Sequence, residues 1–139
     1  MSLGLAAFAC GSPTEPNTDR VVGRIDPSLS VRPVLAAPSQ VRAGVPFTVT
    51  VTTVGFGCTI AEGGAVQVSQ GLARLVPYDR VPGAGHDALC VERVITLLPR
   101  DLQVTLPHAG AARLRVVGFS ASTPEEVMDS VEIEVTVTP

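Results

Sequence analysis

The chain has 139 residues, of which 45% are apolar, so it is long enough for one domain with a buried core. Its net charge of −3 at pH 7 excludes the basic field that attracts nucleic acid, and one Tyr without any Trp leaves few rings for stacking on bases. Charged residues make up only 17%, against roughly 25% in typical domains, so uncharged polar residues must supply much of the surface.

Residues 1–9 (MSLGLAAFA) are apolar and too short to cross a bilayer, as is typical of the end of a secretory signal. The following segment, Ala7-Phe8-Ala9-Cys10-Gly11-Ser12, resembles the lipobox of bacterial lipoproteins. In that family the cysteine becomes the lipidated first residue after cleavage. The resemblance implies a signal peptide over residues 1–9, lacking its basic start, and lipidation at Cys10. It departs from the family at Ala7, where Leu is preferred, and at the bulky Phe8. The alternative is a disordered N-terminus with a buried free Cys10.

The segment Gly11–Asp19 (GSPTEPNTD) is polar, rich in Pro and Thr, and has no apolar periodicity. Such composition favours a flexible linker over a packed element. We therefore expect the lipidated Cys and a tether over residues 10–28, and a folded domain over residues 29–139.

Strict alternation of apolar and polar residues predicts strands with one wet face, the habit of antiparallel sheets. The clearest cases are Val45–Thr53, Leu102–Leu106, Ala112–Val116 and Val131–Thr138. Weaker candidates are Leu29–Leu35, Ala65–Ser69, Leu72–Val76 and Leu89–Leu98. Ser122–Glu126 fits either one helical turn or a plain loop. About eight short strands separated by turn residues indicate a sandwich or barrel.

The strand after Ala43-Gly44, the strand after Ala109-Gly110 and the terminal Val/Glu/Thr strand together resemble a bacterial Ig-like domain. The resemblance covers roughly residues 29–139. It implies an all-β fold, an Ig-like antiparallel β-sandwich of about 7–8 strands. The chain departs from antibody domains because it lacks the buried Trp and the tyrosine corner.

Cys58 and Cys90 are the only thiols in the predicted domain. Given export, the pair predicts a disulfide, which would stabilise by about 3–4 kcal/mol in the chain-entropy model. Two free buried thiols are the alternative if the chain is not exported.

Few residues are candidates for chemistry. His86 lies near Asp79, Asp87 and Glu92 in sequence, but no His-x-His, Cys/His or EF-hand spacing accompanies it, so we predict no metal and no cofactor. Gly118-Phe119-Ser120-Ala121-Ser122 approaches a nucleophile elbow but ends in Ser instead of Gly. His108 is explained by an exposed turn. We therefore predict no enzymatic activity.

Tyr78, Asp79, Arg80, His86 and Asp87 form a candidate contact loop, because binding residues concentrate on loops. The simpler interpretation of the first three is a strand end with a local Asp79–Arg80 pair. Glu132 and Glu134 keep the last strand soluble, and we expect Arg113 and Arg115 opposite them if the two strands are neighbours.

These patterns predict a non-catalytic, membrane-tethered extracytoplasmic β-sandwich module for protein interaction or envelope structure. Its partners would be the membrane, through the N-terminal lipid, and an envelope protein, with no nucleic acid. It would lie on the periplasmic or outer face of a bacterial membrane, or be secreted if Cys10 is not lipidated. The alternative is a periplasmic small-ligand or metal-binding protein using the Tyr78–Glu92 region, or a small hydrolase there; a loop-mediated protease inhibitor has no sequence signature.

Overall fold

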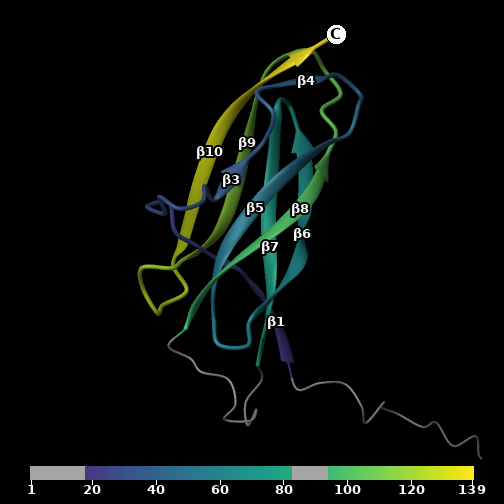
Figure 1. Cartoon of the computed structure of the whole chain (residues 1–139). Helices are drawn as coiled ribbons and strands as arrows, with labels where there is room; N and C mark the ends of the chain where they lie inside the picture. Colours follow the sequence, from purple (N-terminus) through teal and green to yellow (C-terminus); the bar gives the residue numbers. More distant parts are fainter. Residues whose placement is uncertain (1–17, 83–93) are drawn as a thin grey trace, which may run out of the picture.

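A computed structural model describes residues 18–82 and 94–139, and within these ranges the chain is all-β, with ten strands and no helix (Figure 1). The strands are β1 (Thr18–Val22), β2 (Arg24–Ile25), β3 (Leu35–Ala36), β4 (Gln40–Arg42), β5 (Phe47–Phe56), β6 (Ile60–Ser69), β7 (Leu72–Pro82), β8 (Ile95–Val104), β9 (Gly110–Ser120) and β10 (Met128–Thr138). The predicted all-β class is confirmed. Ser122–Glu126 is a turn and not a helix; Thr123 Oγ1 accepts a bond from the Glu125 amide at 3.3 Å.

The strands form one curled, mixed sheet, so the purely antiparallel prediction is wrong. Most pairs are antiparallel, but three are parallel: β2 with β9, β7 with β9, and β4 with β10. Alternation along a strand reports which face is buried and not the direction of its neighbour, so the residue pattern could not reveal this. The concave side holds one apolar core. Its fully buried members include residues from four strands: Ile25, Val49, Val51, Leu75, Leu114 and Val116.

Alternation predicted the inward residues of β10 correctly, because Val135 and Val137 are buried and Val131 and Ile133 pack on the core. The wet face expected along β5 is wrong at Thr52, whereas Thr53 continues the apolar side of the alternation. Thr52 and Thr53 are both fully buried. The Thr52 amide bonds to Val34 O at 2.9 Å, while Thr53 belongs to a buried polar network described below.

The first strands differ from the predicted tether. Residues 18–25, expected within the 10–28 linker, form β1 and β2, because Ile25 is fully buried and β1 pairs along β7. Conversely, Leu29–Leu35 is not a strand; only its last residue enters β3. Pro27 and Pro33 lack the N–H that a ladder needs.

Gly23 lies between β1, which pairs with β7, and β2, which pairs with β5 and β9, so the chain changes its pairing partners at this residue. Its amide donates to Pro77 O and its carbonyl accepts from the Phe119 amide, both at 2.9 Å. A Cβ at position 23 would lie 2.5 Å from Thr53 Cγ2, and one at Gly118 would lie 2.6 Å from Gly23 O. Only glycine at these two positions allows the backbones of β2 and β9 to approach so closely.

The predicted pairing of the last two long strands is confirmed. Glu132 lies opposite Arg115, and Glu134 lies opposite Arg113. Both arginines reach the same carboxylate: Arg113 Nη1 lies 3.0 Å from one Glu132 oxygen, and Arg115 Nη2 lies 3.1 Å from the other.

Candidate functional site

A buried ion pair joins β7 to β8. Asp79 Oδ1 lies 2.7 Å from Arg100 Nη2, and both side chains are almost completely buried. Thr53 Oγ1 donates to Asp79 Oδ2 at 2.8 Å and accepts a bond from Arg100 Nη2. A charge removed from water needs a partner and full hydrogen bonding. Asp79 and Arg100 therefore supply each other's counter-charge inside the curl.

Arg100 also bridges an unpaired seam of the sheet. Strands β6 and β8 lie next to each other, and no ladder joins them in the part of the chain that the structure describes. The Arg100 guanidinium donates to Tyr78 O on β7, to Gly63 O on β6 at 3.4 Å and to Leu98 O at 2.8 Å. Through these bonds and the one to Thr53, Arg100 on β8 connects to β5, β6 and β7 beside the seam that lacks backbone pairing.

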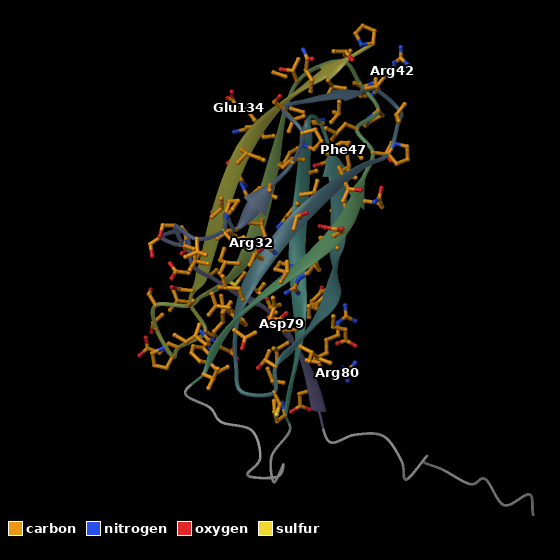
Figure 2. All side chains as sticks on the ribbon, viewed as in Figure 1. Arg32, Arg42, Phe47, Asp79, Arg80 and Glu134 are labelled. Carbon is orange, nitrogen blue, oxygen red and sulfur yellow. The ribbon has the colours of Figure 1, made fainter. Side chains whose placement is uncertain are left out.

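Three of the five candidate contact residues, Tyr78, Asp79 and Arg80, lie within β7 and not in a loop. Asp79 faces the core while Arg80 lies near the same end of the sheet and pairs with Glu62 on β6 (Figure 2). The local Asp79–Arg80 pair is therefore wrong, because successive side chains of a strand point to opposite faces. Tyr78 lies under Arg20, whose Cζ is 3.8 Å from the ring centroid. His86, Asp87, Cys90, Glu92 and Cys10 lie outside the described residues.

Ser120 and His108 lie at opposite ends of β9. The strand rises about 3.3 Å per residue from Gly110 to Ser120, which separates the two side chains by about 30 Å. Ser120 Oγ shares a 2.8 Å hydrogen bond with Ser122 Oγ, and a turn follows it. His108 therefore lies too far from Ser120 to act as its general base. No three His, Cys, Asp or Glu side chains among residues 18–82 and 94–139 are placed to hold a metal ion.

Arg24 on β2 holds the β9–β10 connection. Its Nη1 donates to the carbonyls of Ser120, Thr123 and Glu125 at 2.8, 3.0 and 3.2 Å, and its Nη2 donates to Pro124 O at 3.1 Å. A planar guanidinium offers several donors in one fork, so a single side chain can satisfy a whole turn. The turn is fixed on the end of the sheet beside Phe56, with which it lines a shallow depression.

We call the end of the sheet where β1 begins the Thr18 end (lower end of Figure 1). The registers bring several segment ends together there: Thr18 lies opposite Pro82, Ile60 opposite Arg80, and Phe56 opposite Ile95. Arg24 pairs with both Val54 and Phe119, so the end of β9 and the start of β10 lie at the same level. The opposite end carries Arg42 and the C-terminus (Figures 1 and 2).

Six large apolar side chains are exposed at the Thr18 end, each with between 40% and 64% of its surface accessible. They form what we call the apolar rim: Phe56, Ile60, Val94, Ile95, Val127 and Met128. The large apolar side chains exposed elsewhere in the described residues are Val31, Val45 and Val68. Such grouping is informative because singly scattered apolar residues are ordinary on protein surfaces, whereas gathered ones mark contacts.

A cleft of about 210 Å³ opens beside the rim. Its walls are mainly apolar, with Val21, Val54, Val81 and Phe119, and Phe56 belongs to both cleft and rim. The polar groups along the cleft are Arg24, Thr59, Asp79 and Glu126. Asp79 and Arg24 already form hydrogen bonds within the fold. The cleft therefore presents a small apolar surface to a ligand, and these two polar groups are already engaged.

Sequence reasoning missed both the rim and Arg100. The rim residues lie at or next to the ends of strands. An apolar residue at such a position is predicted to be buried unless the strand register shows that it is exposed. Arg100 follows the apolar Leu97-Leu98-Pro99, and a charge next to such a run was the one available signal for a buried pair. Cys58 lies in the β5–β6 connection at the same end and is not a free thiol. The pairing with Cys90 stays a prediction, since Cys90 is outside the described residues.

The described ranges contain no helix long and apolar enough to span a membrane. Comparison of the chain with protein-family models, with curated proteins and with solved structures finds no match. The site is therefore interpreted from its own chemistry.

Proposed function

We propose that this chain is a non-catalytic, extracytoplasmic module, tethered to a bacterial membrane at Cys10, which makes contact through its apolar rim. The observation that carries the proposal is the position of the rim. Six exposed apolar side chains gather at the end where Thr18 enters the sheet. Exposed apolar groups gain free energy when a partner removes them from water. An anchor at Cys10 would hold this end, and not the C-terminal end, close to the envelope surface.

The state of the polar groups favours contact over chemistry. Asp79 is paired with Arg100, and Arg24 is bonded to four carbonyls of the adjacent turn. A cleft of about 210 Å³ is also smaller than the roughly 300–1,000 Å³ that encloses most small ligands. The small-ligand alternative thus finds less support than a surface that meets an extended partner.

We infer two finer features of the module. The first is an Ig-like sandwich, modified by the strand switch at Gly23; the inward alternation along β9 and β10 supports it. The second is a Cys58–Cys90 disulfide, supported by the bonded state of Cys58 and by the predicted export. Such a bond would fasten the segment after β7 to the rim.

Photocrosslinking in intact cells tests the contact surface. A photoreactive phenylalanine analogue is placed at Ile60 or Ile95 on the rim, or at Val45 or Val68, which are matched apolar positions far from it. We expect defined adducts, resolved by mass as lipid or protein, from the two rim positions and none from the controls. Equal yields at all four positions would contradict a contact surface at the rim.

A further inference from the structure

We propose that the apolar rim docks onto the lipid surface itself and orients the domain on the membrane. The proposal rests on the proposed function, because it takes the tether at Cys10 as its starting point. It goes further by naming the partner: the interfacial layer of the bilayer, and not an envelope protein.

Geometry brings the rim and the membrane together. Eight residue steps separate Cys10 from Thr18, and at about 3.6 Å per step they cannot hold Thr18 more than about 30 Å from a lipidated cysteine. Thr18 lies opposite Pro82, at the same end as Ile60 and Ile95. The rim is therefore the part of the described domain that a lipid anchor keeps nearest to the membrane.

The rim also has the chemistry of a shallow membrane contact. Its side chains come from three separate connections, so they project from the end of the sheet as separate points and do not form one flat face. Phe, Ile and Val enter the headgroup boundary, while the neighbouring polar backbone of the turns stays hydrated. The exposed charges next to it are of both signs, with Asp19, Glu125 and Glu126 beside Arg20, so no uniformly basic field draws this end to anionic lipid and the proposed contact is mainly apolar.

A lipid anchor alone leaves orientation free, because it attaches the chain at one point. A second, apolar contact restricts the domain to the arrangement with the Thr18 end down and the Arg42 end out. The proposed docking thus fixes which surface of the module faces away from the membrane.

The test uses the lack of tryptophan in the chain. Ile95→Trp places a single indole on the rim, and Val45→Trp places one at the opposite end as a matched control. Each protein begins at residue 10 and carries Cys10→Ala with an N-terminal histidine tag, which binds it to phosphatidylcholine vesicles containing a nickel-chelating lipid. Residues 1–9 contribute to none of the described strands. Indole emission is then measured with and without lipids brominated near the headgroup.

We expect bromine to quench Ile95→Trp at least threefold more strongly than Val45→Trp, and Ile60→Asp to remove most of that difference. Ile60→Trp serves as a second reporter if Ile95→Trp does not fold, which circular dichroism checks. Equal quenching at the two ends, or none at either, would overturn lipid docking. The anchor is artificial here, so a negative result leaves lipidation at Cys10 untouched, and loss of lipidation in cells would leave this result standing. Protein adducts from the rim in cells, without quenching on vesicles, would assign the rim to a protein partner and reject the proposal.

Discussion

Asp79 and Arg100 illustrate how a buried charge is tolerated in a small β-domain. Each is nearly inaccessible to water, and each meets the other and Thr53 within hydrogen-bond reach. An ion pair in such a place gains little over an apolar replacement, but losing one partner leaves the other charge stranded. Its contribution is therefore a specific arrangement of β5, β7 and β8 more than net stability.

Arg100→Met should lower the free energy of unfolding by about 3–5 kcal/mol, because Asp79 then stays buried without its counter-charge. Asp79→Leu should cost a similar amount, and the double variant should lose clearly less than the sum of the two. Denaturant titration measures all three, with Arg113→Met, which breaks an exposed pair, as the control. Additive losses would contradict a coupled pair.

Gly23→Ala should destabilise the fold by about 1–3 kcal/mol, because inserting a methyl group into a packed site forces its neighbours apart. The added Cβ would stand 2.5 Å from Thr53 Cγ2 and 3.0 Å from Asp79 Oδ2. Gly63→Ala is the comparison: its Cβ would meet no atom within 4 Å, so only its positive φ of 65° is tested. Denaturant titration measures both variants. A denaturation midpoint for Gly23→Ala equal to that of the parent protein would show that β2 and β9 do not approach as described.

At the scale of elements, the alternating patterns predicted β9 and β10 well because each has one face on the core and one in water. The same reasoning failed at Leu29–Leu35, where Pro33 interrupts the ladder, and at residues 18–25, where a strand follows a polar segment. The parallel pairs of β9 with β7 and β2 depend on contacts between residues about 40 and 95 positions apart. No local pattern carries that information.

Arg24→Met should loosen the β9–β10 connection without unfolding the sheet, because the four carbonyls it satisfies lie in one turn. We expect amide hydrogen exchange of residues 121–127 to accelerate at least tenfold, which corresponds to about 1.4 kcal/mol of local opening. Exchange along β5 and β8 should be unchanged. Arg42→Met, at the opposite end, controls for loss of a charge; acceleration spread over the whole chain would argue against a local clamp.

Glu132→Gln should lower stability by less than about 1 kcal/mol, because exposed ion pairs are weak even when two arginines share one carboxylate. The loss should shrink in high salt, since screening already weakens the pairs in the parent protein. Glu134→Gln is the matched control on the same strand face. A loss above 2 kcal/mol, or one independent of salt, would mean that Glu132 has a role beyond these pairs.

At the scale of the whole molecule, the two ends of the sheet differ in character. The Thr18 end gathers the apolar rim, the cleft, Cys58 and the start of β1, while the other end carries the C-terminus. From the sequence, the all-β class and most long strands could be predicted, whereas Asp79, expected in a contact loop, lies buried in an ion pair within β7. The rim could not be predicted, because it arises where the ends of four strands, β5, β6, β8 and β10, meet.

The claim that this end faces a membrane rests on Cys10, and metabolic labelling tests it most directly. Cells producing the chain with residues 1–9 in place are grown with radioactive palmitate, with and without globomycin, which blocks cleavage of lipoprotein signals. We predict that label enters the wild-type protein, that globomycin causes a larger, uncleaved form to accumulate, and that Cys10→Ala carries no label. Labelling that survives Cys10→Ala, or a wild-type protein that takes up none, would contradict the tethered module proposed here.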